Sequence, residues 1–270
     1  MSATSRWLEL IAAPFRASWR AGLAWAVVFA FFIIATVAFW PAFKGSAALN
    51  DALKVLPTQM LQAFGLQDFA SPAGYLRGGL YDVLVPLMLA AAGAMFANSA
   101  TSAEEDAGRV ELFIAQPVTR IAFMTGRAIS TLLWIVVLML VVLVSQVVSD
   151  AIFGLEIGTS QIVGTIVLSG LIGVFCGTLA IAIAGISARP GLVFGIPIAV
   201  ALIGYIVSAL FPLSDLLSPW VGISPWEWAL GGDPLTNAGE AWRYAALIVP
   251  SIVFVAIGVL AFNRRDVRAA

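Results

Sequence analysis

The chain has 270 residues, of which 61% are hydrophobic and 11% are charged, and its formal net charge at pH 7 is −1. A soluble globular domain carries about 45–50% apolar and about 25% charged residues, so this composition indicates a membrane protein, and the balanced charge gives no support for a nucleic-acid binder. The sequence has no histidine, which excludes Ser-His-Asp and Cys-His catalysis and histidine-ligated zinc. The single cysteine, Cys176, excludes an intramolecular disulfide.

The first twenty residues predict an amphipathic helix. At about 100° per residue, Arg6, Glu9, Arg16 and Arg20 fall on one side. The opposite side carries large apolar side chains: Trp7, Leu8, Ile11, Phe15 and Trp19. Such a helix is suited to the membrane interface, and Pro14 is expected to bend it. The alternative is a cytosolic helix that packs on a partner.

Six apolar runs follow, each long enough to cross a bilayer, which needs about 20 predominantly apolar residues per helix. These runs are Ala21–Trp40, Gly79–Ser99, Ile129–Val148, Ile162–Ile186, Leu192–Phe211 and Ala245–Phe262. A soluble helical bundle is the alternative, but the run Ile129–Val148 contains no charged residue and argues against it. The sequence therefore predicts an all-α membrane protein with a single transmembrane domain over residues 1–270.

The basic residues predict the orientation, because segments on the cytoplasmic side of a membrane protein are enriched in Lys and Arg. Ten of the 14 basic residues lie in segments that share a side with the N-terminus: Arg6, Arg16, Arg20, Arg109, Arg120, Arg127, Arg189, Arg264, Arg265 and Arg268. The other side holds Lys44, Lys54, Arg77 and Arg243. We therefore expect both termini in the cytoplasm and the spans in a bacterial cytoplasmic membrane.

Few side chains inside the spans suggest chemistry. Asp82 lies near the start of the second span, where we interpret it as an interfacial or pore-mouth residue, or as a residue of a substrate cavity. Its neighbours Tyr81 and Met88 are further candidates for the same cavity. One acid does not make a proton relay, which needs several buried acids, bases and partners.

Small residues in two spans favour close packing of helices. Gly170, Gly173 and Gly177 in the fourth span include a GxxxG spacing, and Gly191 and Gly195 at the start of the fifth span make another. Both permit packing within the chain or against a second copy. We expect the contacts within the chain.

The segment between the second and third spans, residues 101–127, is the most informative polar stretch. Ser102 and Glu105 have the spacing of a capping box, and Pro117 is expected to end the helix after Gln116. Thr119 can then cap the helix that becomes the third span. We expect a short helix at the inner face of the membrane, with acids at one end and apolar residues at the other, that contacts a cytoplasmic partner.

Two enzymatic interpretations of this chain fail. Glu104, Glu105 and Arg109 match the EExxxR string of CAAX-type intramembrane proteases, but those enzymes also need histidines. The nucleotide-binding motif GxxxxGK[ST] occurs nowhere in the sequence, so the chain has no P-loop with which to bind ATP by itself.

The same segment resembles the permease subunits of ABC-2 type exporters. The most specific match is Glu104-Glu105-Asp106-Ala107-Gly108-Arg109-Val110-Glu111-Leu112, followed by Gln116-Pro117-Val118-Thr119-Arg120. Residues 56–65 and 73–76 look like the first external loop of the family, residues 224–226 and 230–235 like its last, and residues 263–266 like its basic end. The subfamily is similar to polyketide-antibiotic or multidrug exporter permeases. Arg109 departs from the pattern, since many relatives have a small polar residue there.

The resemblance implies a division of labour. Two six-helix permeases, identical or paralogous, pair in the lipid membrane, and two ATPase subunits hold ATP and Mg beneath them. The coupling helix between spans two and three would contact the ATPase through Glu104, Glu105, Asp106, Gly108, Arg109, Glu111, Leu112, Gln116 and Pro117. The chain would then be a non-enzymatic subunit without a cofactor, exporting an amphiphilic substrate. The alternatives are an ATP-independent secondary transporter or channel and a non-transporting scaffold or immunity protein.

Overall fold

The computed structural model describes residues 3–44, 55, 57, 61, 68–108, 118–237 and 240–265. Within these ranges the ordered elements are all helices, and six helical segments are long and apolar enough to cross a membrane. They are Trp19–Phe43, Pro72–Asp106, Arg120–Phe153, Thr159–Ile186, Pro190–Leu213 and Ala241–Arg264. The prediction of an all-α membrane protein with six spans is confirmed.

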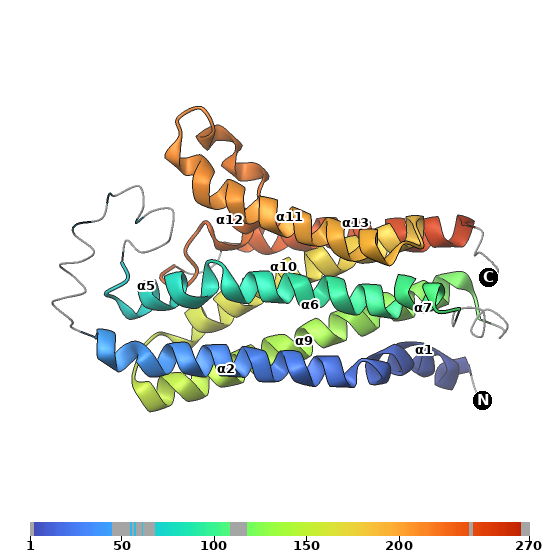
Figure 1. The fold of residues 1–270 in the computed structure, drawn as a ribbon, viewed down its shortest axis with the longest axis horizontal. Helices are drawn as coiled ribbons and strands as arrows, with labels where there is room; N and C mark the ends of the chain where they lie inside the picture. The colour runs from blue at the N-terminus through green and yellow to red at the C-terminus, as the bar shows by residue number, and fades with distance from the viewer. Residues whose placement is uncertain are drawn as a thin grey trace.

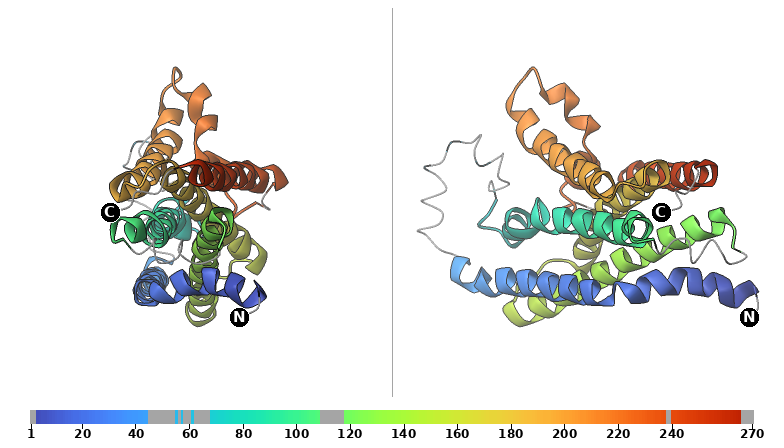
Figure 2. Two further views of the ribbon diagram at one scale, coloured as in Figure 1. Left: turned by 90° about the vertical axis from the view of Figure 1, so that its right-hand side faces the viewer. Right: turned by 45° about the vertical axis from the view of Figure 1, so that its right-hand side comes forward.

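Helix α1, Ala3–Ala17, leads through Ser18 into the first span, α2, Trp19–Phe43. Pro14 lies inside α1, and the view along α2 shows α1 extending sideways from its end (Figure 2). On the exposed side of α1, Glu9 and Arg16 form an ion pair at 2.6 Å. The other side packs on the third span, where the ring of Phe15 stacks on Trp134 with 4.3 Å between ring centroids. The location of α1 in the membrane interface stays a prediction.

The second span consists of four helical pieces. These are α5, Pro72–Leu76; the π-helical turn η1, Arg77–Tyr81; α6, Leu84–Ala100; and α7, Ser102–Asp106. Ser71 caps α5 by accepting a hydrogen bond from the Gly74 amide at 3.0 Å. Gly74 is required there, because a Cβ atom at this position would lie 2.0 Å from the carbonyl oxygen of Asp68.

The remaining spans are three long helices and one that ends in short turns. They are α9, Arg120–Phe153; α10, Thr159–Ile186; α11, Pro190–Leu210, which continues into η2, Phe211–Leu213; and α13, Ala241–Arg264. Between α11 and α13 lie η3, Ser218–Ile223, and α12, Pro225–Leu230. The predicted cap of the third span is confirmed, because the Thr119 hydroxyl accepts a hydrogen bond from the Ala122 amide at 3.2 Å.

Helix α10 is the centre of the bundle. In its most apolar stretch 72% of the residues are buried, against 22% in α2 and in α13. Glycines permit this burial: a Cβ atom on Gly93 of α6 would lie 2.4 Å from the Gly173 carbonyl oxygen of α10, and one on Gly185 would lie 2.2 Å from the Gly258 carbonyl oxygen of α13. The expectation that Gly170, Gly173 and Gly177 pack within the chain is confirmed, since each meets side chains or backbone of α6 or α9. For Gly191 and Gly195 of α11 the same expectation is wrong, because no atom lies within 4 Å of a Cβ added at either position.

The two ends of the bundle differ in what they carry. The start of α1, helix α7 and the end of α13 lie together at one end, which we call the α7 end (Figure 1). Helix α5 lies at the opposite end, which we call the α5 end (Figure 1). An even number of spans brings the first and last helices back to the same end, as the basic residues predict.

Candidate functional site

Helix α7 is held to two other helices by ion pairs from consecutive glutamates. The Glu104 carboxylate lies 2.6 Å from Nη2 of Arg127 on α9, and these two side chains are 11% and 1% exposed. The Arg127 guanidinium also lies over the ring of Phe123, 4.6 Å from its centroid. Glu105 pairs with Arg265, which directly follows α13. Because the pairs are largely removed from water, loss of one partner leaves a charge that water cannot solvate well.

Backbone carbonyls complete the connections at the α7 end. Arg265 donates from Nη1 to the carbonyl of Ala184 on α10 at 3.2 Å, and Arg120 on α9 donates to the carbonyl of Arg265 at 2.5 Å. The Ser102 hydroxyl donates to the carbonyl of Ser187 at 3.4 Å. These groups therefore join α7 to α9, α10 and α13. We call Ser102, Glu104, Glu105, Arg120, Arg127 and Arg265 the α7-end network.

The predicted capping box of Ser102 and Glu105 is wrong. The residue before α7 is Thr101, which makes no side-chain cap, and its hydroxyl donates instead to the Ala97 carbonyl at 2.6 Å. Ser102 is the first residue of the helix, and the Glu105 carboxylate goes to Arg265. The Thr101 hydroxyl thus bonds within the preceding turn of α6, whereas the Ser102 hydroxyl and the Glu105 carboxylate reach partners distant in sequence. Contacts between helices have overridden a local capping pattern.

The predicted helix over 102–116 ends early in the described residues. Helix α7 stops at Asp106, and Gly108 follows with φ +69°, a left-handed conformation that favours glycine. Asp106 is exposed, so its carboxylate is accessible at the end of α7. The other predicted contact residues lie outside the described residues: Arg109, Glu111, Leu112, Gln116 and Pro117.

The structure thus divides the predicted contact residues by exposure. The carboxylates of Glu104 and Glu105 are directed into the chain, whereas Asp106 faces outward. Sequence reasoning missed their partners Arg127 and Arg265. A signal for Arg127 was present, because a charged residue at the edge of a long apolar run needs a partner of opposite charge in the bundle.

A cavity of about 280 Å³ lies towards the α5 end, between η1, α11 and α12. Asp82 lines it, together with Arg77, Tyr205, Trp226 and Glu227. The indole nitrogen of Trp226 donates to the Asp82 carbonyl at 2.8 Å, which fixes α12 against the start of the second span. Asp82 therefore lies in the wall of a cavity, and its role as a pore-mouth or substrate-cavity residue stays a prediction.

Tyr81 and Met88, the other two residues predicted for this cavity, are not among those that line it. Tyr81 is buried, and its hydroxyl donates to Oε1 of Gln146 on α9 at 3.2 Å. Met88 packs against the apolar core between α2, α6 and α9. Successive side chains of a helix point in different directions, so neighbours of Asp82 in sequence face other helices.

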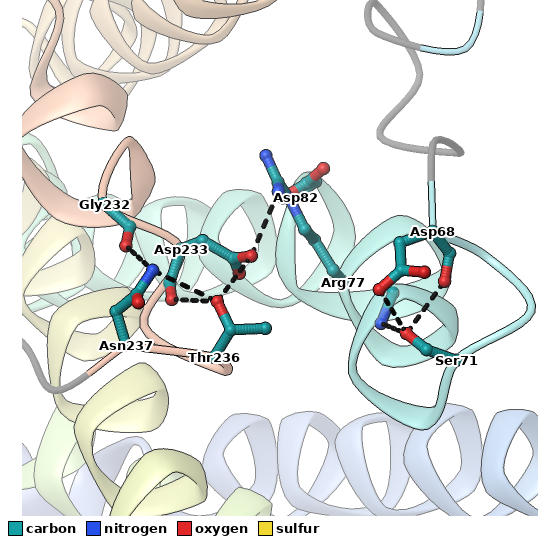
Figure 3. A network of polar contacts seen from close by, with 9 residues as sticks. Asp68, Ser71, Arg77, Asp82, Gly232, Asp233, Thr236 and Asn237 are labelled. Carbon is teal, nitrogen blue, oxygen red and sulfur yellow. Dashed lines mark hydrogen bonds and ion pairs between the residues drawn. The ribbon is translucent and has the colours of Figure 1, made fainter.

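Arg77 joins the second span to the loop before α13 (Figure 3). Its Nε lies 3.2 Å from Oδ1 of Asp82, and its Nη1 lies 3.3 Å from Oδ2 of Asp233. The Asp233 carboxylate also accepts a hydrogen bond from the Thr236 hydroxyl at 2.8 Å. We call Arg77, Asp82, Asp233 and Thr236 the α5-end network.

Ion pairs between separate elements characterise both ends of the bundle. Within the described ranges no three His, Cys, Asp or Glu side chains gather into a group that could hold a metal ion. What the polar residues do is connect helices, at the α7 end and at the α5 end.

Comparison with known families gives a match over nearly the whole chain. The family described as "ABC-2 family transporter protein" matches residues 8–267. No curated protein matches the chain. The family match includes all six spans and α7. This chain therefore belongs to the ABC-2 family of transporter proteins.

Proposed function

We propose that this chain is the permease subunit of an ATP-driven exporter and that separate subunits bind ATP and Mg. The observation that carries the proposal is the family match over residues 8–267. The sequence supports the proposal, because the chain contains no GxxxxGK[ST] motif and thus no P-loop of its own. The α7 end would face the cytoplasm of a bacterium, as ten of the 14 basic residues indicate.

In this proposal α7 carries movement from the ATPase to the spans. It follows α6 after a single residue and is ion-paired to α9 and to the end of α13. A displacement of the segment after Asp106 would therefore act on several spans together. ATP shifts the equilibrium between two conformations of the transporter only by its differential affinity for them. A connection of this kind would pass that preference from the ATPase to the spans.

A second permease and an amphiphilic cargo complete the proposal. Helices α2 and α11 have 22% and 28% of the residues in their most apolar stretches buried, so much of their apolar surface lies open within one chain. A second copy or a paralogue would cover part of that surface. The walls that such a pair offers to a cargo are apolar, which suits an amphiphilic compound better than an ion.

Asp106 is the residue with which to test the ATPase contact. Reversal of Glu104 or Glu105 would break internal ion pairs, whereas the exposed Asp106 can change without loss of a described contact. A tagged chain purified from membranes should retain a P-loop ATPase, identified by mass spectrometry. Asp106→Lys should weaken that retention about tenfold, as charge reversal at an interface does when it costs about 1.4 kcal/mol.

The matched control is Asp215→Lys, the same charge reversal at an exposed residue between η2 and η3. It should leave ATPase retention unchanged. Equal retention by the Asp106→Lys variant would contradict the contact at α7. Transport of an amphiphilic dye by the purified chain in vesicles with an ion gradient and without ATP would contradict the proposed function as a whole.

A further inference from the structure

A second cavity, of about 700 Å³, lies between α9, α10 and α13. Its lining includes Ile121 and Leu132 of α9, Val174 of α10, and Ile252 and Leu260 of α13. We call this cavity the α13 groove. It lies between different helices from the cavity beside Asp82 and shares no lining residue with it.

The wall of the α13 groove offers almost only hydrocarbon. Its two hydroxyl groups belong to Thr178 and Ser251, and both bond within their own helices, to the carbonyls of Val174 at 2.8 Å and of Leu247 at 2.7 Å. These hydroxyls therefore do not require a polar ligand. The occupant that fits such a wall is an apolar chain.

The groove is open to the membrane and has the length of one leaflet. Ile121, Ile252 and Leu260 are 48%, 63% and 56% exposed, so the occupant meets them from outside the bundle. The groove follows α13 from Ile248 to Leu260. At 1.5 Å per residue this is about 18 Å, slightly more than half of the ~30 Å hydrocarbon core.

Two arginines lie at the α7 end of the groove. Arg120 directly precedes Ile121, and its guanidinium reaches the Arg265 carbonyl, so it crosses from α9 to the end of α13. Arg264 continues the four-residue spacing of Ile252 and Leu260 along α13, and it is exposed. In the described part of the chain neither arginine forms a salt bridge, whereas Glu105 nearby is already paired with Arg265. The end of the groove is therefore positively charged.

We infer that the α13 groove binds an anionic phospholipid from the leaflet at the α7 end. One acyl chain lies along α13, and the phosphate lies beside Arg120 and Arg264. The charge favours this occupant, because basic residues between spans near the membrane surface attract anionic headgroups. The inference depends on the membrane location of the chain and not on its partnership with an ATPase.

The test compares two lipids on the full-length chain in detergent micelles. Native mass spectrometry measures the retained phosphatidylglycerol relative to phosphatidylcholine after both are added in equal amounts. The unmodified chain should retain phosphatidylglycerol preferentially. Arg264→Gln and Arg120→Gln should each lower this preference about fivefold. Ile252→Trp should fill the groove and lower the retention of both lipids.

Two control variants distinguish lipid binding in the groove from a general effect of charge or of an added ring on lipid retention. Arg20→Gln removes an exposed cation at the start of α2, and Ile203→Trp adds the same ring to α11 at a side chain 60% exposed. Neither should change the lipid ratio. Thermal unfolding shows whether each variant is folded. If the Arg120→Gln variant does not fold, the Arg264→Gln variant still tests the inference, because Arg264 is exposed.

Three outcomes would overturn the inference. The first is an unmodified chain that retains the two lipids equally. The second is an equal loss of preference with Arg20→Gln and Arg264→Gln, which would indicate general attraction to the α7 end. The third is an Ile252→Trp variant that changes the number of chains in the particle but not the bound lipid, which would assign the groove to a second copy.

Discussion

Arg127 lies almost wholly inside the protein, and its interaction with Glu104 shows what a single residue contributes to the fold. The two side chains are 1% and 11% exposed, with 2.6 Å between nitrogen and oxygen. Removal of both charges from water is costly, and their mutual attraction compensates part of that cost, whereas a single buried charge has no such compensation. Loss of one member is therefore expected to destabilise the fold.

Glu104→Gln keeps the shape of the side chain and removes the negative charge that Arg127 faces. We expect it to lower the free energy of unfolding by about 3–5 kcal/mol, the usual cost of breaking a buried pair. Arg127→Met should cost a similar amount, and the double variant Glu104→Gln/Arg127→Met should be less destabilised than the sum of the two. Denaturant unfolding of the chain in detergent, followed by tryptophan fluorescence, measures all three.

The exposed pair of Glu9 and Arg16 on α1 serves as the control for this cycle. Their side chains are 51% and 64% exposed, so Glu9→Gln should cost less than about 1 kcal/mol. A Glu104→Gln variant no less stable than the Glu9→Gln variant, or strictly additive effects in the double variant, would show that the buried pair does not hold α7 in place.

At the scale of helices, small residues decide how closely α6 and α10 approach. We predict that Gly93→Ala destabilises the chain by at least about 1–3 kcal/mol, because the added methyl would lie 2.4 Å from the Gly173 carbonyl oxygen and the helices would have to separate. Gly195→Ala on α11 is the matched control, since no atom lies within 4 Å of its added Cβ. It should be neutral or slightly stabilising, as helical Gly→Ala changes in open space are. Thermal unfolding compares them, and equal melting temperatures would contradict the close contact.

These elements also show how far the sequence predicts the fold. Hydropathy predicts the six spans because each must bury about 20 residues in lipid, and Thr119 is predicted as a cap because its pattern is local. Contacts between segments that are distant in sequence have no such local pattern. The GxxxG spacing does not reveal that Gly173 meets α6, and nothing near Ser102 indicates that its hydroxyl bonds to the carbonyl of Ser187.

For the candidate sites too, the sequence predicted which segments take part but not which partners their side chains contact. The acidic segment after the second span and Asp82 both take part in contacts between elements. The directions of Glu104 and Glu105, into the chain and towards Arg127 and Arg265, depend on how α9 and α13 pack against α7. The π-helical turn at Arg77–Tyr81 has no local sequence signal, yet it contains the arginine that bridges Asp82 and Asp233.

At the scale of the whole molecule, the two ends of the bundle are held by networks of unequal strength. Side chains in the ion pairs of the α7-end network are 1–17% exposed, whereas those of the α5-end network are 23–39% exposed. Ion pairs open to water contribute roughly 0–1 kcal/mol each, well below the cost of breaking a buried pair. The α5 end should therefore open first when the transporter changes conformation.

Hydrogen exchange measured by mass spectrometry tests this asymmetry. We predict that amides around Arg77 and Asp233 exchange faster than those around Glu104 and Arg127, because local opening is easiest where few buried contacts resist it. Arg77→Gln should speed exchange further at residues 230–237 while it lowers the free energy of unfolding by less than about 1 kcal/mol. Slower exchange at the α5 end than at the α7 end would reverse the order of opening. A loss of stability as large as that of Glu104→Gln would show that the α5 end is held as firmly as the α7 end, which would contradict the predicted asymmetry.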